Sequence, residues 1–76
     1  MTPLELREVR ETLGLGTPRF GRLLGTEGRT IQRYEAGDRA IPGPVAVLAA
    51  ALRDSYAVRR YFGVELEGDS TAKENA

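Results

Sequence analysis

Cysteine and histidine are both absent from this sequence of 76 residues. Without cysteine, disulfides and thiolate chemistry are excluded. Without histidine, the chain lacks the usual general base and the commonest metal ligand of proteins. No group of converging carboxylates replaces them, so the sequence contains no constellation typical of an active site. We therefore expect no enzyme, no bound metal and no cofactor.

Long apolar runs are missing as well. The longest one, Val45–Leu52, is far too short to span a bilayer. The chain opens on Met1-Thr2-Pro3 and then alternates Leu, Glu and Arg, without the pattern of a signal peptide. These features predict a cytoplasmic protein with no membrane partner. The length allows one small domain, which a partner subunit would help to stabilise.

Lysine is nearly absent, since arginine supplies all but one of the 11 basic residues. The net charge of zero hides an uneven distribution, with +2 over residues 17–39, +2 over 40–62 and −3 over 63–76. Arginine carries a planar fork that matches phosphate and guanine. The basic middle of the chain therefore favours a nucleic-acid partner, and the acidic charge belongs mainly to the C-terminal tail.

Helix signals recur along the first half of the chain. Thr2-Pro3-Leu4-Glu5 has the residues of a capping box with proline at the first helical position, and Gly14 ends this first helix. Thr17-Pro18 repeats the signal, and we expect Thr17 to cap a second helix that ends at Gly25. A third helix is expected from about Gly28 to Glu35, with Gly37 as its stop.

The second half continues in the same way. A fourth helix opens at Pro44, and Asp54 or Ser55 either caps a fifth helix or lies inside a continued fourth one. The segment beyond Gly68 is polar and is expected to be disordered. The sequence thus predicts an all-α fold of four to five helices, with a domain over residues 1–66 and a tail over 67–76.

Two of the expected helices meet at Leu24-Gly25-Thr26-Glu27, a spacing typical of a helix-turn-helix. Gly21 lies inside the second helix, where glycine costs about 1 kcal/mol relative to alanine. Either the third helix approaches closely at this point, or Gly21 is only a flexible spot in a weak helix.

The residues of this region resemble those of a known family. The motif reads Phe20-Gly21-x-x-Leu24-Gly25-Thr26-x-x-x-Thr30-Ile31-x-x-Tyr34-Glu35-x-Gly37-x-x-x-x-Pro42. It is similar to that of the phage lambda Cro/C1-type helix-turn-helix proteins, also called the XRE family, over about residues 4–62. The resemblance implies a compact lambda-repressor-like DNA-binding domain that reads DNA with its second and third helices. It also implies an ion pair between Arg10 and Glu35 behind the third helix.

The sequence departs from the family at several positions. Gly21 stands where alanine is usual, and Thr26 replaces valine. Glu27 stands where Ser or Thr commonly caps the third helix. Its charge would weaken non-specific binding to phosphates, or its carboxylate could accept a hydrogen bond from cytosine N4.

The outer side of the third helix supplies the expected base contacts. Arg29 and Arg33 lie four apart, so they share one face, and each can fork onto guanine, while Gln32 can pair with adenine. Taken alone, such residues more often form an ordinary solvated face. Within the helix-turn-helix frame we predict that the base-reading residues are Glu27, Gly28, Arg29, Thr30, Gln32 and Arg33. The expected phosphate contacts are Thr17, Arg19 and Arg39.

The C-terminal apolar residues have two interpretations. They either close the core of the domain or form a homodimer interface, and we favour a dimer because paired helices recognise an inverted repeat. The residues concerned are Tyr56, Tyr61, Phe62, Val64 and Leu66.

The resulting hypothesis is a dimeric transcriptional repressor that binds a palindromic operator in double-stranded DNA without a small-molecule effector. Small members of the family often control their own operon, and phage, toxin–antitoxin and anti-CRISPR operons are compatible settings. When bound to DNA the protein would be associated with the nucleoid. The alternative is an antitoxin-type interaction module, which a stable partner bound through residues 63–76 would favour.

Overall fold

The computed structural model describes residues 1–66, 68 and 69 of the chain. The helices are α1 (Pro3–Thr12), α2 (Thr17–Leu23), α3 (Gly28–Ala36), α4 (Gly43–Asp54) and α5 (Tyr56–Tyr61). No strand occurs among the residues described, so the predicted all-α class is confirmed for this part of the chain. None of these helices has the length and apolar character needed to cross a membrane. Apart from residues 68 and 69, the predicted disordered tail lies outside the described residues.

Caps and glycines set the ends of α1 and α3 where the sequence predicts them. The Thr2 hydroxyl accepts a hydrogen bond from the Glu5 amide, and the Glu5 carboxylate accepts one from the Thr2 amide, both at 3.1 Å. Gly37, at φ 79°, terminates α3 in the left-handed conformation that glycine adopts without strain. The predicted capping box and the predicted stop at Gly37 are therefore both confirmed.

The starts of α2 and α5 are resolved by the structure and not by the sequence. Gly16, and not Thr17, is the N-cap of α2, so Thr17 is the first helical residue and the expected side-chain cap is wrong. Gly16 has no side chain to offer, and α2 begins without such a hydrogen bond.

Between α4 and α5, Ser55 is extended at φ −118° and ψ 115°, and its hydroxyl accepts a hydrogen bond from the Val58 amide at 3.3 Å. The fifth helix is therefore separate from the fourth.

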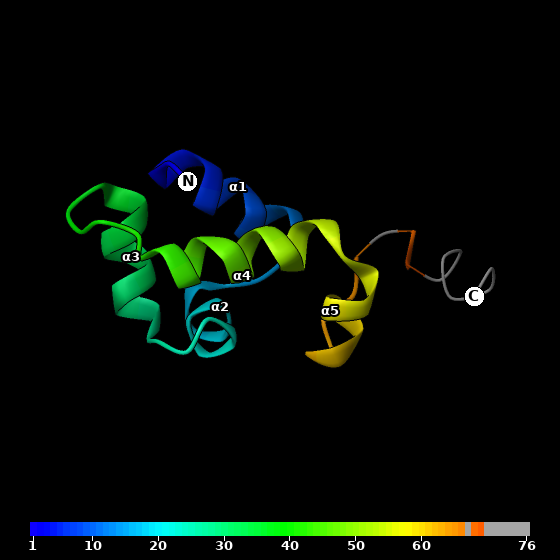
Figure 1. The fold of residues 1–76 in the computed structure, drawn as a ribbon. Coiled ribbons are helices and arrows are strands. Elements are labelled where there is room, and N and C mark those ends of the chain that lie inside the picture. The colour runs from blue at the N-terminus through cyan, green and yellow to red at the C-terminus, as the bar shows by residue number, and fades with distance from the viewer. Residues whose placement is uncertain (67, 70–76) are drawn as a thin grey trace.

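One hydrophobic core joins the helices. In Figure 1, α4 crosses the middle of the molecule, with α3 towards one end of it and α5 at the other. Helix α1 packs against α3 and α4, α2 packs against α3, and α5 packs against α4. The buried apolar residues are Leu6, Val9, Leu13, Leu15, Phe20, Leu24, Ile31, Tyr34, Ala49, Leu52 and Val64. This core holds α3 on the body of the protein by one side only.

Candidate functional site

Helix α3 has one buried and one exposed side. Ile31 is fully buried and Tyr34 is 4% exposed, which places both in the core as the helical spacing predicts. On the other side Arg29, Gln32 and Arg33 are exposed, and Thr30 is half-buried. The third helix therefore presents two guanidinium groups and an amide to solvent from a firmly anchored backbone.

The contact between α2 and α3 is made through glycine. A Cβ atom added to Gly21 would lie 2.5 Å from the carbonyl carbon of Glu27 and 2.7 Å from the amide nitrogen of Gly28. The turn is fixed further by the Thr26 amide, which donates to the Gly21 carbonyl oxygen at 2.8 Å. Gly21 is thus required by close helix packing, and the flexible-spot interpretation is wrong.

Gly28 plays the same part from the other helix. A Cβ atom at this position would lie 2.9 Å from the Cα and nitrogen of Pro18 and 3.1 Å from the carbonyl carbon of Thr17. The sequence predicts Gly28 as a base-reading residue, which the structure does not test. The position that a side chain would occupy at Gly28 faces α2 and is already filled by its first turn, so this glycine is required by close helix packing.

An ion pair joins α3 to α1. Arg10 donates from Nε to Glu35 Oε2 at 2.7 Å and from Nη2 to Glu35 Oε1 at 2.9 Å. The same guanidinium donates from Nη1 to the Leu15 carbonyl oxygen at 3.1 Å. The two side chains are only 18% and 11% exposed, and the hydrogen bonds to Glu35 raise the pKa of Arg10. The pair implied by the resemblance therefore forms, with the fork geometry that fixes orientation.

The three expected phosphate contacts lie in different places. Thr17 is half-buried in the first turn of α2, next to the start of α3. Arg19 is exposed, and its Nη2 donates to the Gly63 carbonyl oxygen at 3.0 Å, so this side chain leans towards the end of α5. Arg39 is exposed in the loop after α3. The structure brings Thr17 close to α3 but turns Arg19 away from it.

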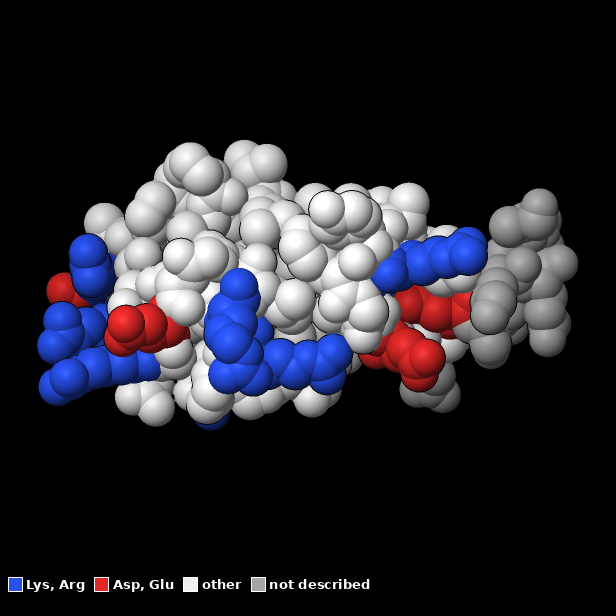
Figure 2. Space-filling view, turned by 90° about the horizontal axis from the view of Figure 1, so that it is seen from below, with Lys and Arg blue, Asp and Glu red and all other residues white. Residues whose placement is uncertain are grey.

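The charged side chains are unevenly spread over one face of the protein. Figure 2 shows Lys and Arg gathered at the end of the molecule where Figure 1 places α3, and again over the middle of the face. Acidic side chains lie between these two groups and towards the opposite end. The basic surface around α3 suits a polyanion, and the acidic atoms within it restrict how the polyanion can approach.

The C-terminal apolar residues divide between core and surface. Val64 is 4% exposed within the core, and Phe62 packs against that core. Tyr61 is 82% exposed and meets the Phe62 ring edge-to-face at a centroid distance of 4.9 Å. Tyr56 and Leu66 are half-buried. The expected interface role of Val64 is therefore corrected, since its surface is used within the chain, and core closure accounts for part of this set.

Arg59 is a structural residue that sequence reasoning missed. It is 7% exposed, and its Nη1 donates to the carbonyl oxygens of Leu52 at 3.0 Å and Arg53 at 2.8 Å, at the end of α4. Its Nε and Nη2 donate to the two carboxylate oxygens of Asp69 at 3.0 and 2.8 Å. No local sequence signal indicates this role, because its ionic partner Asp69 lies ten residues further along the chain.

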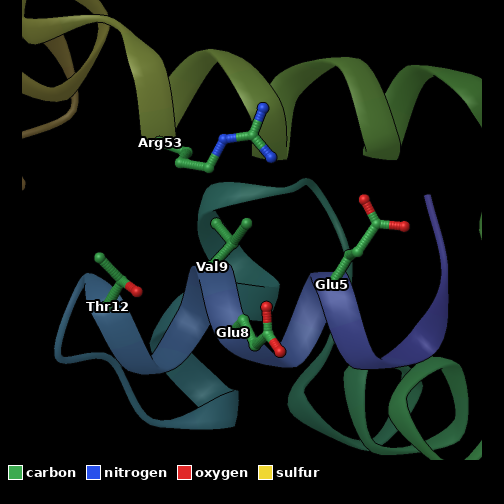
Figure 3. A pocket seen from close by; sticks show the side chains of 5 residues that line it. All are labelled: Glu5, Glu8, Val9, Thr12 and Arg53. Atoms are coloured by element: carbon green, nitrogen blue, oxygen red, sulfur yellow. The ribbon is translucent and has the colours of Figure 1, made fainter.

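A small pocket of about 200 Å³ lies between α1 and α4. Figure 3 shows Arg53 reaching from α4 towards Glu5 on α1, with Glu8, Val9 and Thr12 completing the lining. Two of the polar side chains here are already engaged, since Glu5 is part of the capping box and Arg53 donates twice to Asp54 at 2.7 Å. Within the described residues, no three acidic side chains are arranged to hold a metal ion. The exposed side of α3 is therefore the stronger candidate site.

Comparison with protein-family models, with curated proteins and with solved structures finds no match to this chain.

Proposed function

We propose that this protein is a sequence-specific DNA-binding transcriptional regulator that inserts α3 into the major groove as the reading helix of a helix-turn-helix. The observation that supports the proposal is that α3 has one side buried in the core and the other side exposed. Ile31 and Tyr34 anchor it in the core, while Arg29, Gln32 and Arg33 stand free on the opposite side. The major groove admits one α-helix, and the residues near the start of that helix reach the base edges.

The proposed contacts follow from the chemistry of the side chains. Arg29 and Arg33 each fork onto the O6 and N7 atoms of a guanine, and Gln32 pairs with the N6 and N7 atoms of an adenine. Thr30 contacts a phosphate or a thymine methyl group. Thr17 and Arg39 contact the phosphate backbone and set the register of the helix in the groove.

We further propose that the protein acts as a homodimer. Two copies present two reading helices to an inverted repeat with half-sites about 34 Å apart, and the exposed Tyr61 beside Phe62 supports a contact through α5. A dimer of this kind represses a small operon, its own included, by covering the promoter against polymerase. The fork between Arg10 and Glu35 supports the reading function, because it fixes the orientation of α3 on the body.

The test begins with selection of bound duplexes from a randomised pool by the wild-type protein. We expect enrichment of an inverted repeat, and binding of that operator is then measured for Arg33→Ala. Loss of the paired hydrogen bonds to a guanine should weaken binding by about 1–3 kcal/mol, which is at least tenfold over most of that range. It should also relax the base preference at one position of the operator.

The matched control is Arg7→Ala, which removes the same charge from the exposed outer side of α1. It should leave operator preference unchanged. A wild-type protein that enriches no sequence would overturn the proposed function. An Arg33→Ala variant with unaltered affinity and preference would remove Arg33 from the reading face.

A further inference from the structure

Glu27 occupies an unusual position for an acidic residue. It is the N-cap of α3, the helix end that reaches base edges in the proposed function, and its side chain is exposed. Its carboxylate makes no capping hydrogen bond, and none of the hydrogen bonds or ion pairs among the described residues engages it. The carboxylate is therefore available to an external partner.

The backbone that carries Glu27 is held in place. Its carbonyl carbon lies 2.5 Å from the position that a Cβ of Gly21 would take, so α2 packs directly on it. Its carbonyl oxygen also accepts the first hydrogen bond of α3, from the Ile31 amide at 3.1 Å. The carboxylate is therefore presented from a fixed backbone position at the corner between the two helices.

Resting on the proposed function, we infer that Glu27 is a specificity-determining residue that selects a cytosine in the major groove. A carboxylate only accepts hydrogen bonds. The base edges of the major groove offer donors at cytosine N4 and adenine N6 alone, whereas guanine and thymine present acceptors that repel the carboxylate. Adenine N6 is flanked by the N7 acceptor, which faces the second carboxylate oxygen, so cytosine is the better partner.

The same carboxylate lowers the affinity of the protein for DNA of other sequences. Near the phosphates its charge is repelled, and only the hydrogen bond to cytosine compensates for that repulsion. The protein thereby gains discrimination at the expense of affinity for bulk DNA. This agrees with a chain of zero net charge, which has little general attraction to a polyanion.

The decisive variant is Glu27→Gln, because an amide reads adenine through paired contacts with N6 and N7. With duplexes selected by the wild-type protein, we expect Glu27→Gln to lose about tenfold in affinity at the cytosine and to prefer adenine at that one position. A second variant, Glu27→Ala, should lose the preference without gaining another and should bind unrelated duplex more tightly at low salt.

The matched control is Glu8→Gln, an exposed residue of α1 with the same change of charge. It should keep the wild-type preference at every position. Thermal melts of all variants distinguish a purely structural role of Glu27 from a role in base selection. If the charge of Glu27 only stabilises the N-terminus of α3, its replacement changes the Tm and leaves the base preference unchanged. If the wild-type protein selects a sequence and both Glu27 variants select the same one, the inference is wrong and the proposed function stands. If the wild-type protein selects no sequence, both fail.

Discussion

The Arg10 guanidinium connects three parts of the chain through one side chain. It binds the Glu35 carboxylate on α3 by two hydrogen bonds and the Leu15 carbonyl oxygen between α1 and α2. Replacing Glu35 by glutamine leaves a largely buried guanidinium without its counter-charge. We expect a loss of about 3 kcal/mol in the free energy of unfolding, measured by urea denaturation.

The double variant Arg10→Met with Glu35→Leu gives the matching control. Apolar residues of similar size often replace a buried ion pair at little cost, so this variant should be more stable than Glu35→Gln alone. If the pair serves to orient α3, the double variant folds but binds the selected operator more weakly than the wild-type protein. Equal stability of the single and double variants would contradict a cost of leaving the Arg10 guanidinium without its counter-charge.

Helices α2 and α3 lie as close together as they do because glycine stands on both sides of their contact. At Gly21 an added Cβ meets backbone atoms of Glu27 and Gly28, which have no alternative rotamer to adopt. Gly21→Ala should therefore cost about 2 kcal/mol net, since overpacking outweighs the gain in helix propensity. We expect the Tm to fall by about 10 °C, followed by circular dichroism.

Gly43→Ala is the corresponding control. An added Cβ at Gly43 meets no atom within 4 Å, and Gly43 is not among the glycines with positive φ. This variant should melt at or slightly above the wild-type temperature. A Gly21→Ala variant as stable as Gly43→Ala would contradict the close approach of the two helices.

These elements show which features of the fold are readable in the sequence. Local signals gave good predictions, because a capping box such as that of Thr2 and Glu5 and a stop such as Gly37 act within a few residues. The inward positions of Ile31 and Tyr34 followed from helical periodicity in the same way. The start of α2 was misjudged, since Gly16 takes the capping position, and α4 begins at Gly43, one residue before the predicted Pro44.

Long-range features were harder to predict. A glycine on a helix looks the same in sequence whether it faces a ligand or another helix, so the role of Gly28 depended on how α2 crosses α3. Arg59 and Asp69 are separated by ten residues without periodicity, and nothing local pairs them. The base-reading residues remain predictions, because operator choice depends on docking angle and DNA shape as well as on side chains.

The described part of the C-terminal segment is attached to the rest of the protein at several points. The Gly63 carbonyl oxygen accepts a hydrogen bond from Arg19 on α2, and Val64 is buried in the core. Asp69 then binds Arg59 through both carboxylate oxygens and accepts a further hydrogen bond from the Leu66 amide at 3.0 Å. Through Arg59, which also binds the last carbonyls of α4, the segment contributes to the stability of the whole molecule.

This attachment predicts how stability depends on pH. The hydrogen bonds from Arg59 hold the pKa of Asp69 below its usual value. A carboxyl whose pKa is lowered by folding stabilises the folded state above its unfolded pKa of about 3.9, and this stabilisation is lost as the pH falls through its folded pKa. Asp69→Asn should therefore melt below the wild-type protein at pH 7, with a difference that shrinks towards pH 2.

Two other carboxyl groups also have a lowered pKa, Glu5 through its hydrogen bonds with Thr2 and Asp54 through those with Arg53. Both groups are exposed, so each contributes little to the acid dependence of stability. Asp54→Asn is the control for Asp69, because its pair with Arg53 is exposed and surface pairs contribute little. We expect its melting temperature to follow that of the wild-type protein from pH 7 to pH 2. If Asp69→Asn follows the same curve, Asp69 does not hold the segment in solution. A difference present at neutral pH and lost in acid locates the attachment at the pair formed by Arg59 and Asp69.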